Sequence, residues 1–235
     1  MESERKVVNI VGCGPGGAAY LTGQAHQAVN EAGIVIGIPK FLRLFPEVKR
    51  KIELAAVHTD KVAELVAGLD VSHAAVLVSG DTGLYSLASF LRKALPGCWE
   101  VRFVPGISSV QAACALFCLE WHDMRIFSLH SRPAPPELAE TVWRGKHPVA
   151  ILCGPANRPQ SIARKLLSGV EPGPDTCRGS VRRRRSKPLS GIEPSRRCYA
   201  ACDLGSENQI AWSGILCELA EKRFGGRAVL IIDRR

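Results

Sequence analysis

The fold is organised around Val78-Ser79-Gly80-Asp81-Thr82-Gly83-Leu84-Tyr85. An apolar run over residues 74–78 leads into this stretch, and an apolar, helix-compatible segment over 84–95 follows it. A short buried strand that breaks into glycine and aspartate before a helix presents backbone N–H groups and a carboxylate at its carboxyl end. Open α/β sheets bind small ligands at that edge. The stretch therefore predicts a ligand-binding loop around Asp81.

Length and composition indicate a globular protein. The 235 residues suffice for one large α/β domain or two small ones, with 46% hydrophobic and 23% charged residues. No apolar run approaches the roughly 20 residues that span a bilayer, and residues 1–6 lack the organisation of a signal peptide. We therefore expect a soluble, cytoplasmic protein without a membrane partner.

The nine cysteines are scattered and include no CxxC pair. Several lie inside apolar runs, where a free cysteine packs as a small hydrophobic side chain. We therefore expect reduced thiols in a reducing compartment and no metal site.

Part of the net charge of +9 lies in segment 173–194, which is rich in Arg, Gly, Pro and Ser. The Leu-Ser-Gly-Val-Glu-Pro of residues 167–172 recurs at 189–194 with Ile for Val. We expect a mobile basic insertion that carries a partial duplication. The alternative is an arm that binds RNA or an acidic partner through Arg182–Arg185. A moderately basic body suits an anionic small substrate, and we expect no nucleic-acid partner.

Apolar runs alternate with helix-compatible segments along the chain, which predicts a mostly parallel sheet. The pattern restarts near residue 120, so we expect an N-terminal α/β domain over 1–117 and a C-terminal one over 118–235. The predicted strands are 7–11, 34–36, 74–78, 101–104, 124–129, 149–153 and 228–232. The predicted helices are 18–32, 61–69, 84–95, 110–116, 136–143, 161–167 and 215–223.

Residues 12–17, Gly-Cys-Gly-Pro-Gly-Gly, match GxGxxG between a strand and a helix. A dinucleotide-binding fold also needs an acidic residue at the end of its second strand. Here that strand ends in Gly37-Ile38-Pro39, and Glu31 precedes it. Pro15 moreover lacks the backbone N–H that would cradle a pyrophosphate. The motif alone gives weak support for an NAD- or FAD-dependent oxidoreductase, which stays open as an alternative.

Taken together, the glycine-broken strand ends resemble the tetrapyrrole (corrin and porphyrin) methylase family, the class III S-adenosylmethionine-dependent methyltransferases. Its GxGPG matches residues 12–16, its SGDPG-type loop matches 79–83 with Thr82 where proline is usual, and its PGISS matches 105–109. The resemblance covers nearly the whole chain except 173–194. It implies two α/β domains with a cofactor trough between them.

Within the family, residues 107–111, 121–123 and 128–132 are similar to the branch that methylates ring carbon 5 of precorrin-7 or cobalt-precorrin-7 in cobalamin biosynthesis. Ser131 departs from the usual His-Gly-Arg pattern. The resemblance implies an anionic tetrapyrrole substrate and a homodimer. A separate decarboxylating C(15)-methyltransferase is expected in the same pathway. Action on another ring carbon or another tetrapyrrole is the alternative.

The resemblance also implies roles for individual residues. The loop 79–85 is implied to line the methionine and ribose of the cofactor, segments 153–155 and 211–214 the adenine, and 12–16 the tetrapyrrole. The implied cofactor-binding residues are Ser79, Gly80, Asp81, Thr82, Gly83, Tyr85, Ser108, Ser109, Cys153, Gly154, Pro155, Ala211 and Trp212. The implied substrate-binding residues are Gly12, Gly14, Pro15, Gly16 and Arg132.

Methyl transfer from a sulfonium needs alignment of the two reactants and no protein nucleophile. His130 is expected to act as a base when carbon 5 loses its proton, or alternatively to bind a carboxylate or cap its loop. Asp81 is expected to contact the ligand, or alternatively to serve as a turn or N-cap residue. The candidates for binding the substrate carboxylates are Arg132, Arg43, Lys40 and Arg158.

Overall fold

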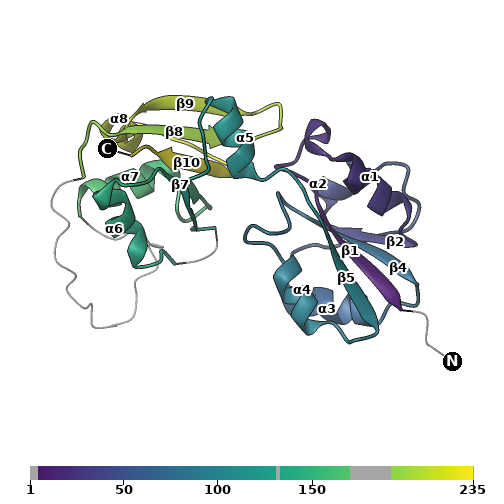
Figure 1. Ribbon diagram of the computed structural model, residues 1–235. Coiled ribbons are helices and arrows are strands. Elements are labelled where there is room, and N and C mark those ends of the chain that lie inside the picture. Colours follow the sequence, from purple (N-terminus) through teal and green to yellow (C-terminus); the bar gives the residue numbers. More distant parts are fainter. Residues whose placement is uncertain (1–4, 131–132, 170–191, 235) are drawn as a thin grey trace. The chain divides into compact units, whose positions relative to one another are not determined.

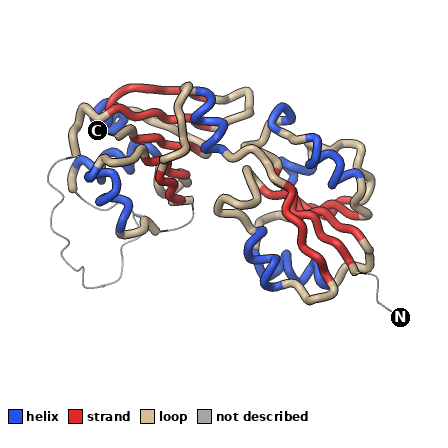
Figure 2. Tube along the Cα trace, in the orientation of Figure 1, coloured by secondary structure: helices blue, strands red, loops and turns tan. Residues whose placement is uncertain are grey.

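The chain forms two compact units, Met1–Ser109 and Val110–Arg235. In the computed structural model, the described residues are 5–130, 133–169 and 192–234 (Figures 1 and 2). The division falls after the first residue of helix α5 (Ser109–Leu116), whereas the sequence suggested a boundary at 117/118. Phe117, directly after α5, packs on Tyr199 of the second unit with ring centroids 5.1 Å apart. This contact explains why the helix groups with that unit.

The first unit contains a five-stranded sheet in the order β3-β2-β4-β1-β5, and every pair in it is parallel. The parallel sheet expected from the alternation of strands and helices is thus confirmed here. The strands are β1 (Lys6–Gly12), β2 (Ile34–Gly37), β3 (Lys51–Glu53), β4 (His73–Val78) and β5 (Trp99–Val104). The helices are η1 (Ala18–Tyr20), α1 (Gly23–Asn30), α2 (Pro39–Leu42), α3 (Thr59–Ala67) and α4 (Ala88–Ala94).

Helices cover both faces of this sheet, so its central strands are apolar throughout. Alternate residues of β1 show the division. Val8 and Ile10 belong to one core with α3 and α4, whereas Val11 belongs to another with α1 and α2 (Figure 1). Both faces are therefore closed, and the carboxyl ends of the strands are left as the place for a site.

The second unit contains a five-stranded sheet in the order β6-β7-β10-β8-β9. Only the β6–β7 pair is parallel, and the other three pairs are antiparallel. The expectation of a mostly parallel sheet is wrong here, because β8 and β9 follow each other without an intervening helix. The strands are β6 (Arg125–Ser128), β7 (Val149–Leu152), β8 (Arg197–Cys202), β9 (Ile210–Ile215) and β10 (Ala228–Ile232). The helices besides α5 are α6 (Glu137–Arg144), α7 (Pro159–Leu167) and α8 (Leu216–Glu221), and their apolar residues share one core with the sheet.

No described helix is long and apolar enough to cross a membrane.

Candidate functional site

The carboxyl ends of β4, β1 and β5 converge on three glycines, Gly80, Gly12 and Gly106. A Cβ atom at Gly12 would lie 2.7 Å from both the Gly106 nitrogen and the Gly80 carbonyl oxygen. One at Gly106 would lie 2.6 Å from the Gly12 carbonyl oxygen. Side chains are excluded at Gly12 and Gly106, because the backbones of the three loops touch one another there. The motifs that the sequence placed after three separate strands therefore form one structure.

Backbone hydrogen bonds join the first two of these motifs directly. The Gly80 N–H donates to the Gly14 carbonyl over 2.8 Å, and the Gly14 N–H donates to the Gly80 carbonyl over 3.2 Å. Both residues have a φ of +67°, a conformation that side chains disfavour. The glycines at 14 and 80 are thus required by the geometry of the junction between these loops.

Asp81 fastens the same loop to the third motif. Its Oδ1 accepts the Gly83 N–H over 2.8 Å, and its Oδ2 accepts the Gly106 N–H over 3.2 Å. The carboxylate therefore holds a turn and ties two loops together, which is the alternative role named for it. The second lone pair of each oxygen still leaves room for a ligand contact.

The other loop residues differ in access. Thr82 and Ser108 are buried, with 4% and 5% of their surface exposed. Ser79, Gly83 and Tyr85 are exposed, and Tyr85 has a φ of +50°. Ser109 begins α5 and is half-buried. The sequence predicted a helix from residue 84, but residues 81–87 form turns and α4 starts only at residue 88. An open loop results, whose most exposed side chains are those of residues 79 and 85.

Lys40 joins this edge of the sheet from α2, which begins directly after β2. Its Nζ donates to the Pro15 carbonyl over 3.0 Å, and its side chain fills the space beside Gly16 that a Cβ would need. A cation therefore lies where a dinucleotide-binding fold would place its acidic residue.

In the second unit, the carboxyl ends of β6 and β7 bring His130 beside Cys153 and Gly154. The His130 Nδ1 lies 3.3 Å from the Cys153 carbonyl oxygen. Since a carbonyl oxygen only accepts, Nδ1 must carry the proton in this bond, and Nε2 of the neutral ring is left as an acceptor. His130 is exposed, so its Nε2 can be reached. A Cβ at Gly154 would lie 3.1 Å from the His130 Cα, which explains the glycine at 154.

Asn157 is a residue of this edge that the sequence reasoning missed. It is 3% exposed, and its Nδ2 donates to the Leu129 carbonyl over 3.2 Å. Its backbone also pairs with Gly154 in both directions, at 3.0 and 3.3 Å. Asparagine is a common turn residue, so its position shortly after the end of a predicted strand was the feature of the sequence that could have identified Asn157.

The Cys153 thiol belongs to the core and not to the accessible site. It is 4% exposed, and its Sγ donates to the Ile151 carbonyl over 3.5 Å. Burial raises the pKa of this thiol well above its ordinary value. The Cys153 N–H donates to the Ala228 carbonyl over 2.8 Å, so only the second lone pair of the Cys153 carbonyl is left for a ligand. Pro155 is exposed.

Ala211 and Trp212 lie in β9, a strand that the sequence analysis did not predict. The Trp212 ring packs edge-on against Phe224, with centroids 6.1 Å apart, and covers Gly214. The Phe224 carbonyl accepts from the Arg158 Nη1 over 3.5 Å. Arg158 is thus held by backbone in this unit.

Arg132 and most of the basic insertion lie outside the described residues. Within the part of the chain that the structure describes, no group of three or more His, Cys, Asp or Glu side chains could hold a metal ion.

Comparison with protein-family models identifies a family for this chain. The model of the tetrapyrrole (corrin/porphyrin) methylases matches residues 7–219. The chain is 32% identical over 169 residues to a probable cobalt-precorrin-7 C(5)-methyltransferase from Methanocaldococcus jannaschii, covering 71% of this chain and 79% of that protein. It is 28% identical over 162 residues to a cobalt-precorrin-7 C(5)-methyltransferase from Salmonella typhimurium, covering 69% and 78%.

Two solved structures have the same fold. The precorrin-6Y methylase from Archaeoglobus fulgidus superimposes with a TM-score of 0.68 at 19% identity, over 97% of this chain and 98% of that one. The uroporphyrin-III C-methyl transferase from Thermus thermophilus, crystallised with S-adenosyl homocysteine, gives 0.67 at 20% identity over 96% of both chains. The expected class of two α/β units is confirmed.

Proposed function

The chain belongs to the tetrapyrrole (corrin/porphyrin) methylases, and we propose that it transfers a methyl group from S-adenosylmethionine to ring carbon 5 of precorrin-7 or cobalt-precorrin-7. The observation that carries this proposal is the 32% identity to a relative named for that reaction, over 71% of the chain. A cytoplasmic location, a homodimer and a separate enzyme for methylation at carbon 15 are parts of the same proposal.

The glycine junction suits the cofactor that the family uses. The N–H groups of Gly80 and Gly83 are engaged within the junction, but Gly83 is exposed, and so are Ser79 and Tyr85 beside it. Main-chain groups at a strand end can hold a nucleoside and an amino acid by hydrogen bonds. We assign the loop 79–85 with Ser108 and Ser109 to the methionine and ribose, and 153–155 with Ala211 and Trp212 to the adenine. When bound, S-adenosylmethionine supplies an electrophilic methyl group.

Residues of the chain then orient the acceptor and move a proton. We assign Gly12–Gly16 and Arg132 to the tetrapyrrole, whose acetate and propionate groups need cationic partners. The exposed Nε2 of His130 is free to accept the proton that carbon 5 loses after methylation. The bond from Nδ1 to the Cys153 carbonyl fixes the ring for that role.

A second candidate is methylation of another ring carbon. It is favoured by 26% identity over 144 residues to a cobalt-factor III methyltransferase from Priestia megaterium, although only 27% of that protein is covered. The cofactor loops alone cannot separate the two candidates, since both relatives are methyltransferases.

The deciding experiment incubates the purified chain with S-adenosylmethionine and either cobalt-precorrin-7 or cobalt-factor III. We expect a mass gain of one methyl group on cobalt-precorrin-7, at carbon 5 by NMR. Methylation of cobalt-factor III alone would establish the second candidate, and methylation of neither would refute both.

A further inference from the structure

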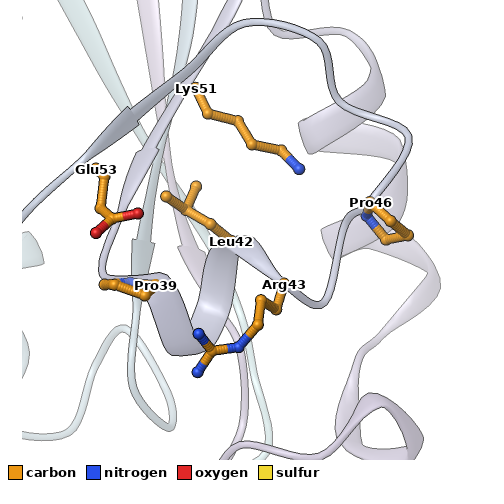
Figure 3. Close-up of a pocket in the computed structure, with 6 residues that line it drawn as sticks. All are labelled: Pro39, Leu42, Arg43, Pro46, Lys51 and Glu53. Carbon is orange, nitrogen blue, oxygen red and sulfur yellow. The ribbon is translucent and has the colours of Figure 1, made fainter.

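The first unit contains a pocket between α2 and β3, at the β3 edge of its sheet. Its volume is about 500 Å³, within the roughly 300–1,000 Å³ common for small-ligand pockets. The pocket is open, since most of its lining side chains are partly or fully exposed. It is lined by Pro39, Leu42, Arg43, Pro46, Lys51 and Glu53 (Figure 3).

Two cations and one anion surround this α2–β3 pocket. Arg43 follows α2, while Lys51 and Glu53 lie on β3. Within the described residues, no hydrogen bond or ion pair engages the side chains of these three. The excess positive charge is therefore available to an anionic ligand.

The remaining lining residues, Pro39, Leu42 and Pro46, are apolar. Leu42 is 5% exposed and lies between the charged residues in Figure 3. Pro39 and Pro46 add apolar surface, and their rings restrict the backbone conformation at both positions. Apolar side chains next to cationic ones suit a carboxylate that is attached to an apolar ring. They suit a strongly hydrated inorganic anion less well.

Helix α2 connects this pocket to the glycine junction. Its Lys40 bonds the Pro15 carbonyl, whereas its Pro39 and Leu42 line the pocket. These α2 residues belong to the first unit and follow the carboxyl end of β2. We propose that the α2–β3 pocket binds peripheral carboxylates of the tetrapyrrole through Arg43 and Lys51. This inference rests on the proposed function and names a specificity site for it.

Removing a positive charge or a negative charge from the pocket should change the KM for the substrate in opposite directions. Arg43→Gln and Lys51→Gln should each raise the KM for cobalt-precorrin-7 by about tenfold, because each removes a charged partner of a carboxylate. Glu53→Gln should lower this KM, because it removes a repelling carboxylate. In all three variants kcat and the affinity for S-adenosylhomocysteine should stay unchanged.

Lys49→Gln and Glu47→Gln are matched controls. They make the same charge changes in the same stretch of chain, but these residues do not line the pocket. We expect both controls to keep the wild-type KM. Equal shifts in KM in the controls and in the pocket variants would refute the proposed binding pocket, because the general surface charge would then explain the shifts.

Binding of uroporphyrin, measured by its fluorescence, tests the pocket without catalysis. We expect weaker binding by Arg43→Gln and Lys51→Gln than by Lys49→Gln. If the wild type methylates no precorrin but binds uroporphyrin with this dependence, the proposed function fails and the pocket stands. If the pocket variants lose affinity for S-adenosylhomocysteine instead, the pocket holds the cofactor carboxylate and the inference is wrong.

Discussion

The carboxylate of Asp81 accepts a hydrogen bond from the backbone N–H of Gly106, with an Oδ2–N distance of 3.2 Å. The two residues are 25 positions apart and belong to the loops after β4 and β5. The Gly83 N–H occupies the other oxygen of the same carboxylate. One side chain therefore sets both the turn of its own loop and the position of the next loop.

Replacing Asp81 should affect stability and cofactor binding together. Asp81→Ala removes the acceptor of two backbone N–H groups, so the free energy of unfolding should fall by about 1–2 kcal/mol. Binding of S-adenosylhomocysteine should weaken, because the loop proposed to line it loses its tie. Urea denaturation and calorimetry measure the two effects. Lower stability with unchanged affinity would reduce Asp81 to a turn residue.

Gly106 should tolerate no side chain. Gly106→Ala places a Cβ against the backbones of Gly12 and Gly80, which cannot retreat without breaking the ends of β1 and β4. We expect a loss of at least about 3 kcal/mol in unfolding free energy. Gly97→Ala is the matched control, since nothing lies within 4 Å of its added Cβ. Similar urea midpoints for both variants would contradict the convergence of the three loops.

The buried strands were predictable, since β1, β4, β7 and β10 are apolar and sit at the centre of their sheets. Apolar content marks such strands whatever their partners are. The unpredicted strands were β3, a three-residue edge strand, and the pair β8 and β9. Strand β9 is an edge strand with little buried surface, so it lacks that signal. The orientation of β8 depends on β10, which lies far along the chain.

The site was predictable as motifs but not as contacts. The sequence singled out Gly12, Gly80 and Gly106 within their loops, yet only the strand order brings the loops together. Lys40 was a candidate for a substrate carboxylate, and its bond to Pro15 depends on α2, a helix too short to be recognised from periodicity. Long-range packing sets such contacts.

His130 should affect the chemical step more than binding. His130→Ala should lower kcat by about 100-fold, the typical contribution of a general base, with an unchanged affinity for S-adenosylhomocysteine. His58→Ala is the control, because His58 is an exposed histidine at the start of α3. Initial rates of methylation, measured over a range of cobalt-precorrin-7 concentrations, give kcat and KM separately. A rise in KM alone would instead assign His130 to carboxylate binding.

The buried thiols should make the fold sensitive to alkali. Burial raises the pKa of Cys13 and of Cys198 from 9.0 to about 12, and that of Cys114 and of Cys202 to about 11. Below pH 9 these thiols are protonated in both states. As pH rises above 9, the unfolded chain releases protons that the native chain keeps, so stability falls until the native thiols also ionise. Each thiol should contribute about 1.4 kcal/mol of lost stability per pH unit in this window.

Variants isolate this effect from the other groups that titrate in alkali. Cys13→Ala should be less stable at pH 7.5, because it leaves a small cavity in the core. Its unfolding free energy should then fall less steeply between pH 9 and 10.5, by about 1.4 kcal/mol per pH unit. Cys98→Ala removes an exposed thiol and should keep the wild-type slope. Urea denaturation across this pH range gives the slopes. Equal slopes for Cys13→Ala and the wild type would mean that the Cys13 thiol ionises as readily in the native core as in the unfolded chain.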